Sequence, residues 1–315
     1  MGLSVLGLQQ STAWGWSSPA TWACLIVGIV LLVAFVRWEF RTDDPLVPLR
    51  LFENRGFAID NAVLFLLSIC FVPLFFFASL YAQIALGESA QNAGLLLLVF
   101  FGGFTVGAQW GGRILDRRGA RPTVVVGCAL AAVGFYLWGS RLTDLSFGKQ
   151  WPYLALAGAG VGFTLGPAST DALNRASRAA YGAVVGLTQT VRNFAGSLGL
   201  AVLGSILITD TNSNVEHTLT KVGVPAAAAA RVAHAISSAS SQASSSAGAH
   251  PSHAVARQIQ VDFASATRTV VYGMAAAMAV AFAVAFLRLP PGKAEQPVGE
   301  ISDPAVEPAT VPAKT

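Results

Sequence analysis

Residues 111–122 read GGRILDRRGARP, and this short stretch decides the fold. It holds four arginines and one aspartate, and it lies between two long apolar runs at 93–110 and 123–139. Charged side chains between two apolar runs are typical of a loop that joins two membrane helices on one face of a bilayer. The stretch therefore predicts two membrane-spanning helices joined by a tight, positively charged turn.

The composition of the whole chain agrees with a membrane protein. Of its 315 residues 54% are hydrophobic and 11% are charged, whereas an ordinary soluble domain has about 25% charged residues. The net charge is +4, but the arginines fall in short gaps between apolar segments and form no single basic face. This distribution favours a lipid bilayer as the partner and argues against a nucleic acid.

Seven apolar windows are long enough, or nearly so, to cross the hydrocarbon core as helices, which takes about 20 residues. Each must be helical, because lipid offers no partner to a free backbone N–H or C=O group. The sequence thus predicts an all-α polytopic membrane protein. The expected spans are 19–36, 57–82, 92–112, 123–140, 151–172, 183–208 and 267–288.

Basic residues gather in every second gap between these spans. The gaps at 37–56, 113–122 and 173–182 contain several arginines, whereas 83–91 has no basic residue and 141–150 has only Arg141 and Lys149. Arginine-rich loops stay on the cytoplasmic side of a membrane. We therefore predict a multi-pass protein of the inner (plasma) membrane, with its N-terminus outside and its C-terminus in the cytoplasm.

The remaining segments are expected to lie outside the bilayer. We interpret 37–56 as a cytoplasmic loop, 209–266 as an extracellular loop rich in Ala and Ser, and 289–315 as a disordered cytoplasmic tail. Residues 1–18 lack the features of a signal peptide and look like the remnant of a preceding span and its outer loop. We expect either the C-terminal piece of a longer protein or a misplaced start codon.

The polar turn has a spacing that resembles a known signature. Gly112, Asp116, Arg117, Gly119 and Arg121 match the cytoplasmic loop signature G-x-x-x-D-R-x-G-x-R of the major facilitator superfamily. A glycine at each end would let two helices approach and the chain turn. Asp116 could accept hydrogen bonds from a helix N-terminus or pair with an arginine, and so latch one arrangement of the helices. A plain positively charged loop is the alternative.

Three further stretches narrow the resemblance to the fourteen-span drug:proton antiporters of the EmrB/QacA type, over nearly all of 1–290. They are STAWGWSSP at 11–19, RWEFRTDDPLVPLRLFENRGF at 37–57 and GLTQTVRNFAGSLGLAVLGSIL at 186–207. The resemblance implies two six-helix bundles related by a pseudo-two-fold axis, two extra helices between them, alternating access, and export of drugs driven by proton entry.

Mapped in this way, 19–36 is one linker transmembrane helix, and 57–208 with 267–288 is the C-terminal six-helix bundle. In the family the other bundle carries its own loop signature and commonly the carboxylate that takes the proton. The resemblance predicts a proton-coupled efflux transporter, conferring drug resistance, for small hydrophobic or amphipathic substrates. The alternative is a truncated membrane fragment without autonomous transport, which at best associates with a separate N-terminal half.

Polar side chains inside a span are costly, and they are our candidates for a transport path. Gln189, Arg192 and Asn193 are spaced three and four residues apart and share one helix face. Arg192 could face a water-filled path, or it could extend its side chain to the cytoplasmic interface. Asp60 and Asn61 lie one turn into 57–82. Asp60 could serve a proton or cation path, or be an acidic residue favoured by a helix start.

Two other patterns concern local structure. Asp171 and Arg175 are four residues apart and indicate a local ion pair. A face of glycines indicates close helix packing or a hinge in a broken helix. The residues concerned are Gly158, Gly162 and Gly166, followed by Pro167, and then Gly196 and Gly199.

No enzyme, cofactor or metal site is predicted. His250 and His253 are close together, but no carboxylate or cysteine completes a set of metal ligands. We find no Ser-His-Asp arrangement, no phosphate-binding loop and no glycine fingerprint that follows a strand.

Overall fold

The structure is a computed structural model, which describes residues 18–39, 41, 49–176, 181–221 and 253–292. Nearly all of these residues are helical, and within these ranges no β-strand forms. The described part of the chain is therefore all-α, and this confirms the prediction from hydropathy.

Each expected span corresponds to one long helix. Among the described residues, α3, α4, α5, α7 and α9 are long and apolar enough to cross a membrane. The helices are α2 (Pro19–Glu39), α3 (Arg55–Ile84), α4 (Ala90–Arg118), α5 (Ala120–Arg141), α6 (Phe147–Asn174), α7 (Tyr181–Lys221) and α9 (His253–Arg288), with the short 3-10 helices η1 (Leu49–Glu53) and η2 (Leu142–Asp144).

Side-chain caps define where two of these helices begin. The side chain of Asn54 accepts hydrogen bonds from the backbone N–H groups of Gly56 and Phe57, and so caps α3. The hydroxyl of Ser89 accepts from the N–H of Asn92 at the start of α4. Such caps satisfy amides that have no partner inside the helix.

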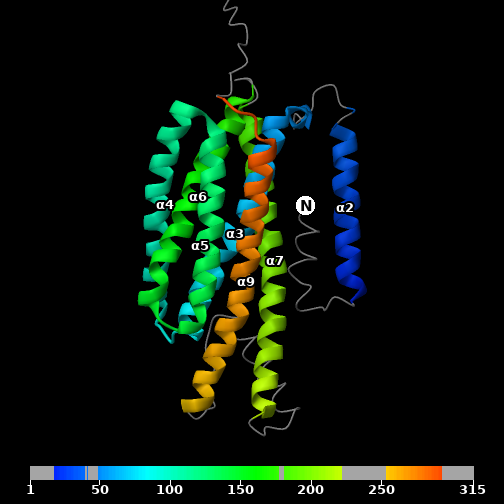
Figure 1. Cartoon of the computed structure of the whole chain (residues 1–315). Coiled ribbons are helices and arrows are strands. Elements are labelled where there is room, and N and C mark those ends of the chain that lie inside the picture. The colour runs from blue at the N-terminus through cyan, green and yellow to red at the C-terminus, as the bar shows by residue number, and fades with distance from the viewer. Residues whose placement is uncertain (1–17, 40, 42–48, 177–180, 222–252, 293–315) are drawn as a thin grey trace, which may run out of the picture.

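Helices α7 and α9 continue well past the spans that hydropathy predicts. α7 has 41 residues, or about 60 Å, which is about twice the thickness of a hydrocarbon core. Both helices extend beyond the others at one end (Figure 1). The expected spans, which end at 208 and begin at 267, are therefore shorter than the helices that contain them. A helix satisfies its own backbone and need not stop where the side chains become polar. The middle of the expected loop lies outside the described residues.

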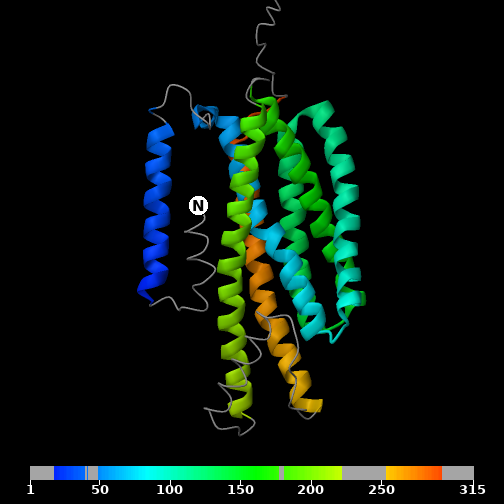
Figure 2. The ribbon, with the colours of Figure 1, turned by 180° about the vertical axis from the view of Figure 1, so that it is seen from behind.

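Among the described residues, six helices form a bundle, with α2 beside it. They are α3, α4, α5, α6, α7 and α9. α6 packs against α4 and α5, while α9 packs against α5, α3 and α7. α3 also contacts α4, α6 and α7. α2 makes no comparable contact with the described helices, and both views show it apart from them (Figures 1 and 2).

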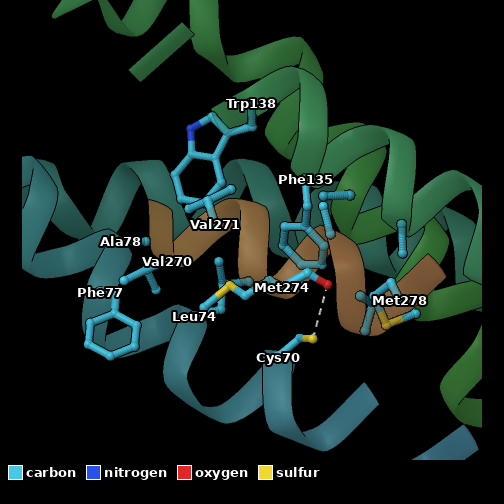
Figure 3. Packing of buried hydrophobic residues seen from close by; sticks show 14 of the residues in the cluster. Cys70, Leu74, Phe77, Ala78, Phe135, Trp138, Val270, Val271, Met274 and Met278 are labelled. Carbon is cyan, nitrogen blue, oxygen red and sulfur yellow. Dashed lines mark hydrogen bonds between the residues drawn. The ribbon is translucent and has the colours of Figure 1, made fainter. Parts of the chain in front are cut away.

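The core of the bundle is apolar and joins α3, α5 and α9 (Figure 3). Phe135 and Trp138 of α5 are fully buried against side chains of the other two helices. The thiol of Cys70 donates to the carbonyl oxygen of Met274 at 3.4 Å. Cys70 and Cys128 are free and buried, as expected for small apolar residues.

Glycines bring the backbones of α4 and α6 into contact from both sides. Gly158 and Gly162 of α6 lie against the carbonyl oxygens of Phe100 and Phe104 of α4. The pattern is reciprocal, because glycines of α4 lie against the backbone of α6. These are Gly103 against Ala155, Gly107 against Ala159 and Gly111 against Phe163.

The other glycines of the expected face differ from one another. Gly166 has no heavy atom within 4 Å of the position that a Cβ would take, whereas the neighbouring Pro167 is buried. Gly196 and Gly199 of α7 lie against Val72 and the backbone of Ile69 of α3. Close helix contact thus depends on some of these glycines and not on Gly166.

We predict that Gly158→Ala destabilises the bundle, whereas Gly166→Ala does not. A Cβ at Gly158 overlaps the Phe100 carbonyl, so α4 and α6 must separate, at a cost of about 1–3 kcal/mol. The matched change at Gly166 should stay within about 0.5 kcal/mol. Thermal unfolding of the purified variants in detergent measures both. Equal losses at the two positions would contradict the role of close contact.

Candidate functional site

The candidate residues gather at one end of the bundle and along the part of α7 next to it. This end, called here the arginine-rich end, contains the start of α3, the α4–α5 turn, the end of α6, the start of α7 and the end of α9. It is the upper end in Figure 1. The expected cytoplasmic loop signature lies here.

Gly119 makes the turn of the signature. It separates α4 from α5 with φ of 84° and ψ of −179°, a conformation that is essentially restricted to glycine. Its N–H donates to the carbonyl oxygen of Leu115, and it forms an isolated bridge with Gly292. Arg121 donates to the carbonyl oxygen of Phe286 at 2.8 Å. The signature therefore connects the α4–α5 turn to the end of α9.

The first half of the signature is placed differently from our expectation. Gly112 has no heavy atom within 4 Å of the position that a Cβ would take, whereas a Cβ at Gly111 would lie 3.1 Å from the Cα of Phe163. The reason is helical periodicity, since Gly111 continues the row of Gly107. Asp116 and Arg117 are both exposed, and within the described residues Asp116 has neither of the expected contacts. The latch remains a prediction.

Gln189, Arg192 and Asn193 form one hydrogen-bonded group on α7. The amide of Gln189 donates to Asn193 Oδ1 at 3.0 Å, and Arg192 Nη1 donates to Gln189 Oε1 at 3.3 Å. Gln189 and Asn193 are exposed. Arg192 is half-buried, and its Nε has no hydrogen-bond partner among the described residues. Arg192 follows Tyr181, where α7 begins, by 11 residues, which is about 16 Å along the axis.

Phenylalanines form a cluster where α3 meets α4. Phe71 and Phe75 of α3 contact one another and rings of α4, and Phe75 stacks on Phe101 with 5.3 Å between the ring centres. Phe101 remains 41% exposed, as does Phe76, whereas Phe77 is buried in the core. The phenylalanines at this contact therefore present one side to the core and another, accessible aromatic side to the surroundings.

A cluster of three charges is buried where α3 meets α6. Arg175 Nε and Nη2 donate to Asp171 Oδ2 at 2.9 and 2.7 Å, which is the local pair that the spacing indicates. Asp60 of α3 joins this pair, with its Oδ2 3.4 Å from Arg175 Nε. The Asp60 side chain is 0% exposed, and neither of its oxygens has a hydrogen-bond partner among the described residues.

Two neighbours of Asp60 shape this cluster. Gly56 lies one turn before it, and a Cβ at Gly56 would overlap the guanidinium group of Arg175. Asn61 is also buried; its amide donates to the carbonyl oxygen of Phe57 at 3.0 Å, and its Oδ1 has no partner in the described part of the chain. Sequence reasoning did not connect Asp60 with Arg175, although a glycine just before a buried aspartate was an available signal.

In the part of the chain that the structure describes, no group of three or more His, Cys, Asp and Glu residues could hold a metal ion. His250 lies outside the described residues. What the site offers is hydrogen-bonding polar groups, aromatic surface and buried charge.

We predict that Gly119→Ala loosens the α4–α5 turn, whereas Gly112→Ala leaves it intact. An alanine at the Gly119 dihedral angles is strained by about 1–3 kcal/mol, and relief of this strain should release the contacts with α9. Limited proteolysis at the arginine-rich turn, which exposes Arg117 and Arg118, should be faster in the first variant only. Equal cleavage rates in the two variants would show that the conformation of Gly119 does not hold the turn.

Comparison with known proteins reveals several relatives that are named as exporters. A tetracenomycin C resistance and export protein of Streptomyces glaucescens is 29% identical over 203 residues, covering 64% of this chain and 38% of that protein. A cephamycin export protein of Amycolatopsis lactamdurans is 33% identical over 220 residues, covering 67% of this chain and 44% of its own length. A multidrug transporter of Bacillus subtilis is 27% identical over 197 residues, covering 62% of this chain and 36% of that protein.

The chain thus spans less than half of the length of these relatives. The family model described as Major Facilitator Superfamily matches residues 3–200, which is more than half of this chain. The helices of the chain and this match agree with the resemblance of its α4–α5 turn to the loop signature of that family. The chain belongs to the major facilitator superfamily of membrane transporters.

Proposed function

We propose that this chain is the C-terminal half of a proton-coupled exporter of small hydrophobic or amphipathic compounds. In this proposal it belongs to the fourteen-span drug:proton antiporter branch, lies in the plasma membrane, and has its arginine-rich end in the cytoplasm. Residues 19–36 are the linker helix, and α3 to α9 are the second bundle. Transport is not catalysis, and no enzymatic step is proposed.

The polar group on α7 is the observation that carries the proposal. Gln189 and Asn193 are exposed 8 and 12 residues after the start of an apolar helix, which is about 12 and 18 Å along its axis. Their bonds to one another and to Arg192 use only part of their hydrogen-bonding groups, and hydrocarbon would leave the rest unsatisfied at such a depth. A water-filled path, or a second bundle facing α7, would provide partners for them. Arg192 adds a positive charge that suits a substrate with an anionic or strongly polar group.

The aromatic cluster supports a hydrophobic cargo. Phe101 presents an accessible ring that is backed by Phe71 and Phe75, and aromatic rings stack well on flat apolar molecules. The relatives are named for export of tetracenomycin C, for export of cephamycin and for multidrug transport. From these names we carry to this chain only the class of cargo, small organic compounds.

The orientation rests on the positive charges. Arg55, Arg117, Arg118 and Arg288 are exposed at one end of the bundle, and loops rich in arginine remain on the cytoplasmic side. The proposal also places the segment between α7 and α9 outside the cell. The expected tail at 289–315 lies outside the described residues beyond 292. Protons are the coupling ion in this proposal because of the EmrB/QacA resemblance.

The second candidate is a chain that does not transport alone and needs a separate N-terminal half. The open polar face of α7 favours it, because no described helix of this chain covers Gln189 or Asn193. Dye efflux from cells without their own pumps, with the chain expressed alone or together with a first bundle, separates the two candidates. Efflux in neither condition would contradict both.

For the transport path we predict that Arg192→Leu reduces efflux at least about tenfold or changes the range of dyes exported, as loss of a charged group at a binding surface commonly does. The control is Thr190→Val, because Thr190 is exposed on the same helix and its hydroxyl donates to the Gly186 carbonyl oxygen. Efflux is compared at equal amounts of protein in the membrane. Normal efflux by the Arg192→Leu variant would show instead that Arg192 extends to the cytoplasmic interface.

A further inference from the structure

The buried charges between α3 and α6 do not balance. Two carboxylates, Asp60 and Asp171, share one guanidinium group, that of Arg175. With all three groups ionised, the cluster carries one net negative charge. The two strong hydrogen bonds of Arg175 both go to Asp171, at 2.9 and 2.7 Å. Asp60 receives only the longer approach of 3.4 Å.

Among the residues that the structure describes, no other group compensates the charge of Asp60. Its side chain is 0% exposed and neither oxygen has a hydrogen-bond partner among the described residues. Arg192 lies further along α7 and donates to Gln189. The other described charged side chains at this end of the elements packed against α3 are exposed: Glu53, Arg55, Arg113, Asp116, Arg117, Arg118 and Arg288.

An ionised carboxylate without a partner is very costly to bury, and such a group becomes neutral or draws water into its site. The arrangement around Asp60 is nevertheless closely built. Gly56 leaves room for the guanidinium group, where any Cβ would overlap it. Phe57 next to it is fully buried with Ala172 of α6, with Ala176 just after α6 and with Val184 of α7. The start of α3 is therefore packed against the end of α6.

We propose that Asp60, Asp171 and Arg175 form a proton-binding switch, in which a proton on Asp60 keeps the start of α3 closed on α6 and loss of this proton opens the arginine-rich end. Uptake moves one proton from hydronium in the water phase to a carboxylate oxygen of Asp60 and leaves water behind. The net charge of the cluster changes from one negative charge to zero. The switch deepens the proposed function, on which its role in coupling rests.

The switch joins a proton to a change of shape through one contact. When Asp60 is neutral, Arg175 satisfies Asp171 and the apolar residues around Phe57 can stay dry. When Asp60 is ionised, it competes with Asp171 for Arg175, and the excess charge is relieved by hydration, which requires α3 to move away from α6. A ligand shifts such an equilibrium by its different affinity for the two states, and here the ligand is the proton.

Infrared spectroscopy of the purified full chain in lipid tests the proton directly. We expect a carboxylic-acid C=O band at neutral pH that disappears as the pH rises. Asp60→Asn should remove this band. Asp171→Asn should remove it at neutral pH as well, because Arg175 then pairs with Asp60 and keeps it ionised. In the control, Asp144→Asn, the band should persist, since Asp144 lies at the opposite end and pairs with Arg141 at 3.6 Å.

Cysteine labelling tests the opening of the same end. In a chain with its three native cysteines replaced by alanine, the reporter Ala172→Cys lies buried beneath Phe57. Its reaction with a small maleimide, relative to the exposed reporter Ser140→Cys, should become faster on the order of tenfold as the pH rises, a size typical of coupling between a ligand and a conformational change. Adding Asp60→Asn should keep the reporter closed at every pH.

The outcomes separate this inference from the proposed function. A wild-type chain without the band, or a band that survives in Asp60→Asn, overturns the switch even if efflux is normal. A band that behaves as expected in a chain that exports nothing supports the switch and leaves transport to the efflux assay. If Asp60→Asn does not fold, as its melting curve would show, Asp171→Asn still decides, because a band that persists in that variant at neutral pH also overturns the switch.

Discussion

Apolar helices gain little by leaving lipid for one another, so a membrane bundle depends on how closely its backbones can approach. In this chain α4 and α6 approach closely, where Gly158 and Gly162 lie against the carbonyl oxygens of Phe100 and Phe104 and glycines of α4 lie against the backbone of α6. α6 thereby becomes the element against which α4, α5 and α3 are placed. The end of α6, which carries Asp171 and Arg175, is therefore placed by this contact together with those to α5 and α3.

The two ends of α3 are held by different kinds of interaction. At one end Tyr81 donates to the carbonyl oxygen of Leu142 at 2.7 Å, and the amide of Gln150 donates to the Tyr81 hydroxyl at 2.7 Å. This network is neutral, so a change of pH near neutrality leaves it intact. At the other end the contact is made by Asp60 and Arg175, in a cluster with unequal charges. The helix is thus fixed at one end and adjustable at the other.

Hydropathy alone located the seven long helices of the described residues, because the cost of exposing backbone groups to lipid leaves few alternatives. It did not locate the ends of α7 and α9, since helices can continue in water without an apolar sequence. Local spacing indicated the pair Asp171–Arg175 and the grouping around Arg192. It failed for Gly112, where Gly111 makes the contact, and for Asp60, whose partners come from α6. Such contacts depend on which helices are neighbours, and a single sequence contains no direct record of this.

The length of α7 has a mechanical consequence. A helix of 41 residues is a stiff rod of about 60 Å. Near its first turn, Val184 belongs to the same apolar cluster as Phe57, which lies three residues before Asp60. A tilt of about five degrees at that end would displace the opposite tip by about 5 Å. A small rearrangement around one bound proton would therefore produce a displacement of several ångströms at the opposite end of α7.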